Sequence, residues 1–113
     1  MSLWLLNAFS LNMLNEFPMS IHLEEVTLEQ ARELLSGGFR SAVGHENTAV
    51  LMSELLGLEV EAHRMTLSLQ HGERALIGQY SGPRLEEGRT SLPEGATLRW
   101  ILMSPKEPEP HKV

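Results

Sequence analysis

The stretch Leu3-Trp4-Leu5-Leu6-Asn7 near the start of the chain predicts a short buried strand that ends at an asparagine. Four consecutive apolar residues are too few for a helix, and Asn7 interrupts the run. Ser10 follows as a candidate cap for a helical turn over residues 11–17, which Pro18 would stop. The chain is therefore expected to open with a strand whose end carries small polar side chains.

Two helices are expected in the next part of the chain. Residues 19–24 alternate between apolar and polar side chains, which predicts a half-buried strand before the first helix. Thr27 is expected to cap a helix over residues 28–35, which should end at Gly37-Gly38. A second helix is expected to begin near His45 and to end before Gly57.

Further strands are expected in the second half of the chain. Residues 60–69 alternate in polarity, and the turn His71-Gly72 predicts that they pair as a hairpin with residues 73–80. Gly82-Pro83 would then turn the chain into a short helical segment over residues 84–87.

Residues 97–103 are expected to form the last strand. The predicted fold class is α/β: a small mixed sheet of about five strands, covered by two main helices. We expect one domain over residues 1–104, because no repeat or linker divides it. Residues 105–113 are rich in proline and charge, which predicts a disordered tail.

The composition restricts the classes of partner. The formal net charge of -6 argues against a protein that coats duplex DNA or RNA, because such binding depends on neutralising phosphates. A compact anionic ligand held by two or three arginines remains compatible with it. Asn7, Ser10 and Asn12 interrupt the apolar start, so we expect neither a signal peptide nor a membrane span, and a cytoplasmic location.

Metal, thiol and serine-hydrolase chemistry receive little support. The chain has no cysteine and no aspartate. No serine lies on a Gly-x-Ser-x-Gly elbow. We expect no metal site and no cofactor. The histidines other than His45 show no ligand-like spacing: His22, His63, His71 and His111.

His45 is the most informative single residue. It follows Gly44 at an expected helix start, where free N–H groups and the helix dipole favour an anion. An imidazole near neutral pH can donate a proton to a leaving group. The alternative is a helix-cap histidine without a chemical role.

Arg84 and Glu87 lie three residues apart on the expected helical segment. One interpretation is that they form a surface ion pair worth about 0–1 kcal/mol. The other is that Arg84 binds a phosphate while Glu87 orients its guanidinium. Four further polar residues are candidates for ligand binding, each with an ordinary alternative as a turn, cap or solvent-facing residue: Asn7, Ser10, Arg64 and Gln79.

Three stretches in this order, LNAFSLNML (residues 6–14), VGHENT (43–48) and RLEEG (84–88), resemble the viral type III anti-CRISPR ring nucleases. These small proteins, which also have bacterial and prophage members, cleave cyclic tetra-adenylate. The resemblance covers residues 3–103. It implies that His45 is the catalytic acid, that Arg84 binds phosphate and stabilises the transition state, and that Glu87 acts beside it. It also implies a ligand pocket lined by Asn7, Ser10, Arg64 and Gln79.

The resemblance further implies a homodimer that encloses the ring across a two-fold axis and works without metal. Linear di-adenylates with a 2′,3′-cyclic phosphate would be the products, and their formation would switch off type III CRISPR signalling. The site would then act in the cytoplasm, and in the host cytoplasm if the protein is viral. Ser81-Gly82-Pro83 departs from the family pattern and could shift Arg84 relative to His45.

Several alternatives remain open at the level of sequence. A lid could be formed by residues 88–95 or by residues 37–44. The chain could sequester a cyclic oligonucleotide without cutting it, with His45 serving only as a cap. It could also be a structural or partner-binding protein, given its apolar helices and acidic surface.

Overall fold

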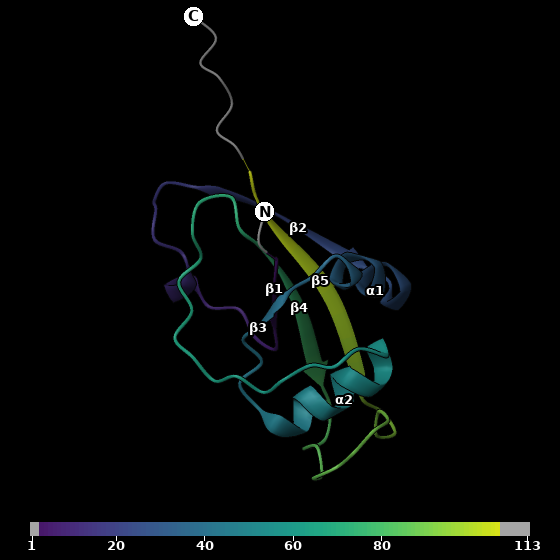
Figure 1. Ribbon diagram of the computed structural model, residues 1–113. Coiled ribbons are helices and arrows are strands. Elements are labelled where there is room, and N and C mark those ends of the chain that lie inside the picture. The colour runs from purple at the N-terminus through teal and green to yellow at the C-terminus, as the bar shows by residue number, and fades with distance from the viewer. Residues whose placement is uncertain (1–2, 107–113) are drawn as a thin grey trace, which may run out of the picture.

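The computed structural model describes residues 3–106 and contains a five-stranded mixed sheet with two α-helices (Figure 1). The predicted fold class is therefore confirmed. No helix within residues 3–106 has the length and apolar character needed to cross a membrane. The elements in chain order are β1 (Leu3–Leu6), the 3-10 helix η1 (Leu11–Met13), β2 (Ser20–Val26), α1 (Leu28–Ser36), β3 (Arg40–Ser41), α2 (Glu46–Leu56), β4 (Arg74–Ser81) and β5 (Thr97–Lys106).

The sheet has the strand order β2-β5-β4-β1-β3. Strand β1 is parallel to both of its neighbours, β3 and β4, whereas β5 is antiparallel to β2 and β4. The carboxyl ends of β1, β3 and β4 consequently meet at one edge of the sheet. Segments that follow these strands carry Asn7, His45 and Arg84.

Alternate residues of the strands build an apolar cluster on each face of the sheet. Leu5, Leu76 and Trp100 face α1 and α2, which cover one side (Figure 1). On the opposite side, Leu6, Ile77 and other strand residues pack against Leu67 and Leu69. The four-residue run of β1 is buried along its whole length because both faces are covered.

Both helices begin and end close to the predicted positions. Thr27 forms a capping box with Gln30, in which the Gln30 N–H donates to Thr27 Oγ1 at 3.1 Å and Gln30 Oε1 accepts from the Thr27 N–H at 2.9 Å. Helix α2 has His45 at its N-cap and ends at Gly57, whose φ of 66° is left-handed.

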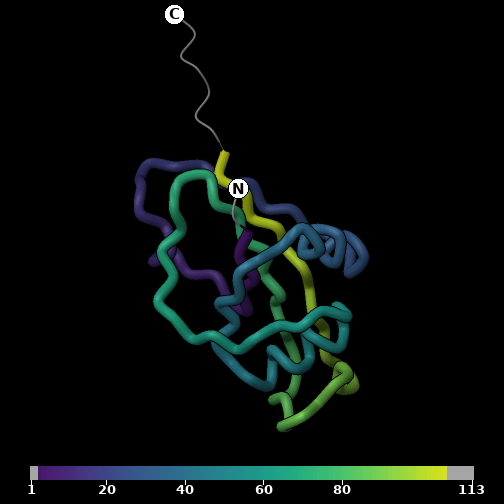
Figure 2. The backbone as a smooth tube through the Cα atoms, viewed as in Figure 1, coloured from purple at the N-terminus to yellow at the C-terminus, as the bar shows by residue number. Residues whose placement is uncertain are grey.

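The predicted strand over residues 60–69 and its hairpin are wrong. This stretch is an extended arm without a ladder, and Figure 2 shows it as a wide loop between α2 and β4. Its contacts with the rest of the protein include an isolated bridge between Val43 and Ala62 and the Leu69 N–H, which donates to the Met13 carbonyl at 2.8 Å. Both edges of β4 are already occupied by β1 and β5, so the arm has no strand partner there. Its alternation matches burial only at the end of the arm, where Leu67 and Leu69 are buried, whereas Met65 is 40% exposed.

Three element boundaries also differ from expectation. The turn capped by Ser10 ends at Met13 instead of residue 17. Residues 84–87 form no helix, because a four-residue segment gains too few hydrogen bonds to offset helix nucleation and Gly88 follows at a φ of 75°. Strand β5 runs to Lys106, so residues 105 and 106 belong to the sheet; the remaining part of the expected tail lies outside the described residues.

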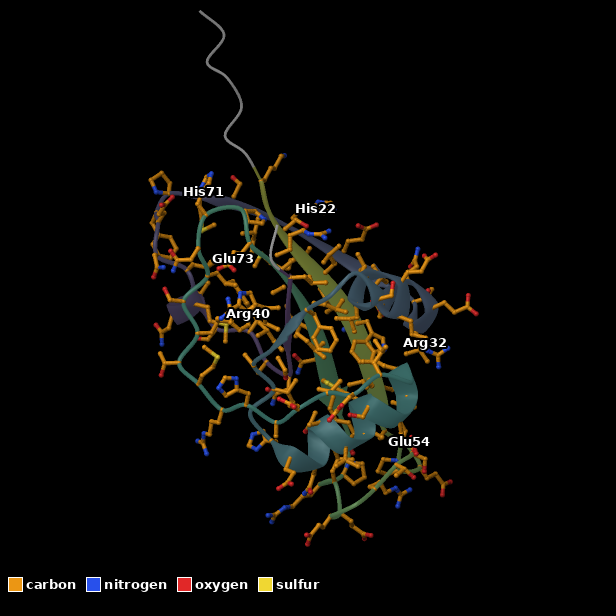
Figure 3. All side chains as sticks on the ribbon, in the orientation of Figure 1. His22, Arg32, Arg40, Glu54, His71 and Glu73 are labelled. Atoms are coloured by element: carbon orange, nitrogen blue, oxygen red, sulfur yellow. The ribbon has the colours of Figure 1, made fainter. Side chains whose placement is uncertain are left out.

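The amino-terminal half of β1 is held by polar contacts around Trp4. The indole Nε1 donates to Glu73 Oε2 at 2.9 Å, and the Arg40 guanidinium lies 4.3 Å from the centre of the ring. Figure 3 shows Glu73 and Arg40 on the side of the molecule that holds the arm. These contacts attach β3 and the residue directly before β4 to β1, at the end of the sheet away from the candidate site.

Candidate functional site at the carboxyl edge of the parallel strands

Three polar segments that are far apart in sequence leave the same edge of the sheet. Asn7 directly follows β1, Gly44 and His45 follow β3, and Arg84 follows β4. Because these three strands are parallel, the residues after them emerge at one end. The edge beyond the carboxyl ends of parallel strands is the usual place for ligands in α/β folds.

Asn7 and Gly44 are joined directly. The backbone N–H of Gly44 donates to Asn7 Oδ1 at 3.0 Å. Arg64 of the arm passes over the same point, because a Cβ added to Gly44 would lie 3.8 Å from Arg64 Cγ and 3.9 Å from Asn7 Oδ1. Both distances are ordinary van der Waals contacts, so two of the predicted ligand-binding residues, Asn7 and Arg64, meet directly before His45.

His45 occupies the N-cap position of α2, as the sequence predicted. Its backbone carbonyl accepts from the Ala49 N–H at 3.0 Å, but its side chain makes no capping hydrogen bond. The imidazole is exposed and lies at the positive end of the helix dipole. The imidazole therefore does not cap the helix, and it is available to an anionic ligand. His22 and His71 lie at the opposite end of the sheet (Figure 3).

The segment after β4 is fastened to its neighbours just before and just after Arg84. The Tyr80 hydroxyl donates to the Pro83 carbonyl. Gly82 packs so closely that an added Cβ would lie 2.8 Å from Ala96 Cα, and its φ of 149° also requires glycine. Asn47 Nδ2 donates to the Leu85 carbonyl at 3.4 Å. Through Asn47, the Arg84 segment is tied to the first turn of α2.

Arg84 and Glu87 line one open pocket together with Asn47, Leu85 and Glu86. Of the two alternatives for Arg84 and Glu87, the surface ion pair is not formed within residues 3–106, and no hydrogen bond joins the two side chains there. Both alternatives assumed helical spacing, and the segment is not a helix. The exposed guanidinium of Arg84 is left available to a ligand.

Ser10 and Gln79 lie farther from these contacts. Ser10 caps η1, where its hydroxyl accepts from the Asn12 N–H at 3.3 Å, so its structural role is confirmed. Gln79 is exposed on β4, two residues beyond Ile77, the partner of Leu6 at the end of β1. It therefore lies beyond the end of β1, on the sheet face opposite the helices.

The charges at this edge are mixed. Arg64 and Arg84 are exposed cations, whereas Glu46, Glu86 and Glu87 are exposed acids. A phosphodiester at the start of α2 would meet free backbone N–H groups, an imidazole and arginine side chains. In general, an imidazole can act as an acid, and arginine side chains can stabilise charge on phosphoryl oxygens.

A more enclosed cavity of about 80 Å³ lies at the other end of the sheet. Leu14, Met19, Leu69 and Met103 line much of it, so it continues the apolar cluster on that face. Pockets for drug-sized ligands occupy about 300–1,000 Å³, which makes this cavity far too small for a tetranucleotide. Within residues 3–106, no group of three or more His or Glu side chains is placed to hold a metal ion.

The comparisons with known proteins identify the family. The STIV B116-like family model matches residues 3–97. The chain belongs to the STIV B116-like family. Among its relatives is Uncharacterized protein 26 of Sulfolobus islandicus filamentous virus (isolate Iceland/Hveragerdi), which is 36% identical over 88 residues, 77% of this chain and 74% of that protein.

The solved structure of B116 of Sulfolobus turreted icosahedral virus matches this B116-like chain with a TM-score of 0.77 and 31% sequence identity. The match covers 91% of this chain and 98% of that one. Both relatives are viral proteins, and the second shares the whole fold. The matched span includes β1, both helices and β4, and hence the edge that carries the candidate site.

Sequence reasoning missed the contacts that assemble the site. Asn47 is separated from Leu85 by 38 residues, and Asn7 from Gly44 by 37. Both contacts pair a side-chain amide with a backbone group, which almost any residue can offer. The only local signal was the position of Asn7 directly after a buried strand and of Asn47 two residues after His45.

Proposed function

We propose that this B116-like protein is a metal-independent ring nuclease that cleaves cyclic tetra-adenylate and so switches off type III CRISPR signalling. One observation carries the proposal. His45 and Arg84, which the sequence resemblance names as acid and phosphate ligand, follow two parallel strands at one edge of the sheet. The viral origin of its relatives agrees with a role against host immunity.

In the proposed mechanism, a ribose 2′-hydroxyl of the ring gives its proton to water and attacks the adjacent phosphorus, in line with the departing 5′-oxygen, so that the 2′-oxygen–phosphorus bond forms as the 5′-oxygen–phosphorus bond breaks. His45 protonates that oxygen, and general acid catalysis of this kind contributes about 10²–10⁴-fold. Arg84 stabilises the charge on the phosphoryl oxygens, with Glu87 beside it. Arg64, Asn7, Ser10 and Gln79 bind the ring. The products are linear di-adenylates that end in a 2′,3′-cyclic phosphate.

The His45 imidazole makes no capping hydrogen bond, which supports its role as the acid over that of a helix cap. A capping side chain would accept a bond from the first helical turn, and His45 makes none. Arg64 and Asn7 converge at Gly44, the residue directly before it.

The proposal includes a homodimer. A two-fold assembly can present the same residues to opposite phosphates of a symmetric ring. We expect the protein with bound ring to have the mass of two chains in light scattering. A monomeric mass with the ring bound would contradict this part of the proposal.

The deciding experiment is incubation of wild type and His45→Ala with cyclic tetra-adenylate in excess chelator, with the products resolved by mass. We expect linear di-adenylate cyclic phosphate from wild type only. Full activity of His45→Ala with normal binding would exclude His45 as the acid. An intact but bound ring in both samples would support sequestration without cleavage, and an unbound ring would point to another ligand.

A further inference from the structure

We infer that Asn47 is a positioning residue that holds Arg84 in register with His45. The inference rests on the proposed function for its catalytic meaning, whereas the tether itself is a feature of the fold. Asn47 is the second residue of α2, and its amide Nδ2 donates to the Leu85 carbonyl at 3.4 Å. It therefore lies two residues after the proposed acid and contacts the residue after the proposed phosphate ligand.

The segment that carries Arg84 needs such a tether. Residues 82–96 contain neither helix nor strand, and Figure 1 shows them beside α2 between β4 and β5. Two backbone hydrogen bonds within the segment each close a turn: the Arg89 N–H donates to the Glu86 carbonyl, and the Ala96 N–H donates to the Pro93 carbonyl. Tyr80 fixes only the entry to the segment, at Pro83.

Within residues 3–106, the Asn47 contact is the hydrogen bond that joins α2 to this segment. Arg84 itself is exposed and pairs with no acid there, so its own side chain does not hold it in place. Leu85, by contrast, is buried to 9% exposure. Burial of Leu85 therefore holds the segment against the core, and the hydrogen bond from Asn47 fixes where the segment lies relative to the first turn of α2.

Asparagine suits this task because its amide both donates and accepts within a short side chain. Asn47 is partly buried and borders the pocket that Arg84 and Glu87 line. Loss of its donor would leave the Leu85 carbonyl without this partner and allow Arg84 to move relative to His45. A displacement of about 1 Å at a reacting centre costs up to about 10²-fold in rate.

A double-mutant cycle tests the catalytic part with cyclic tetra-adenylate as the probe. Asn47→Ala is made in wild type and in Arg84→Ala, and single-turnover cleavage is measured for all four proteins. We expect Asn47→Ala to slow wild type by about ten- to a hundredfold and to leave the Arg84→Ala rate unchanged. An equal loss in both backgrounds, or no loss in either, would overturn the inference.

Limited trypsin digestion tests the tether without any assay of activity. Trypsin cleaves after Arg84 and Arg89, and release of the segment should speed both cuts in Asn47→Ala several-fold. Asn47→Asp keeps the shape but cannot donate, so it should digest as Asn47→Ala does. Glu46→Gln, a neighbouring exposed site of the same helix, is the matched control and should digest like wild type.

The two assays separate the possible failures. If wild type leaves the ring intact but Asn47→Ala and Asn47→Asp digest faster than Glu46→Gln, the proposed function fails and the tether stands. If digestion at Arg84 and Arg89 is unchanged in both Asn47 variants, the tether is wrong, whether or not the protein cleaves the ring.

Discussion

Asn7 at the end of β1 accepts a hydrogen bond at 3.0 Å from the backbone N–H of Gly44, 37 residues later in the chain. The bond connects the central strand to the loop that delivers His45 to the start of α2. It uses the side-chain oxygen of Asn7, so the amide nitrogen stays available to a ligand. One residue can thus shape the site and also contribute to binding.

Replacement of Asn7 separates these two roles. Asn7→Ala leaves the half-buried Gly44 N–H without its acceptor and should lower the free energy of unfolding by about 1 kcal/mol. Asn7→Asp keeps an acceptor and should retain that stability, but its carboxylate should weaken binding of an anionic ring. Urea denaturation and ring-binding titrations measure the two effects. Wild-type stability of Asn7→Ala would mean that the bond contributes nothing to the fold.

The helices could be predicted from sequence because their signals are local. Thr27 and Gln30 encode a capping box within four residues, and Gly57 supplies the left-handed stop of α2. The place of Asn7 at the edge of the sheet could also be predicted, since it directly follows a buried strand. The roles of His45, Arg84 and the other candidate residues rest on the family resemblance and stay predictions.

The arm over residues 60–69 shows where local signals fail. Its alternating pattern placed His63, Met65, Leu67 and Leu69 on one face, and only Leu67 and Leu69 are buried. Whether such a stretch joins a sheet depends on a free strand edge, and β4 is flanked by β1 and β5, which lie elsewhere in the sequence. Strand pairing, like the contacts of Asn47 and Asn7, is a property of the assembled chain.

Gly82 is predicted to be essential for placing Arg84. In Gly82→Ala the new Cβ would lie 2.6 Å from Ala96 Cβ, at a backbone φ of 149° that disfavours any side chain. We expect a loss of stability of about 1–3 kcal/mol, together with slower ring cleavage because Arg84 shifts. Gly88→Ala is the matched control: its φ is 75°, but no atom lies within 4 Å of the added Cβ. Equal losses in the two variants would show that backbone strain, and not contact with Ala96, is the cause.

Glu73 is predicted to stabilise the fold without affecting cleavage. Its two carboxylate oxygens accept from Trp4 Nε1 at 2.9 Å and from the Gln70 N–H at 2.7 Å. Glu73→Gln has a single acceptor oxygen and should lower the unfolding free energy by about 1–3 kcal/mol. The contact lies at the opposite end of β1, so ring cleavage should stay at the wild-type rate. Glu94→Gln, at an exposed site, should change neither quantity; a cleavage defect in Glu73→Gln alone would link the two ends of the sheet.

The pair between Glu25 and Arg99 gives a prediction on pH. Hydrogen bonds from Arg99, with its positive charge, hold the pKa of the Glu25 carboxyl below its usual value. A folded-state pKa below the unfolded one stabilises the protein above the unfolded pKa, and the gain disappears as the pH falls through the folded pKa. In Arg99→Gln, the pKa of Glu25 measured by NMR should rise toward the ordinary glutamate value. An unchanged pKa would mean that the pair does not persist in solution.

Arg84 is predicted to act on the ligand and not on the fold. It is exposed and forms no ion pair within residues 3–106, so Arg84→Ala should melt at the wild-type temperature. Single-turnover cleavage should fall by about 10²–10³-fold, because a donor to the transition state is lost. Arg84→Lys should recover part of the ring affinity through its charge but little of the rate, since an ammonium cannot form the bidentate contact. Arg89→Ala, whose side chain donates to the Ser91 carbonyl at 3.0 Å, is the control and should cleave normally. A wild-type rate for Arg84→Ala would remove this residue from the mechanism.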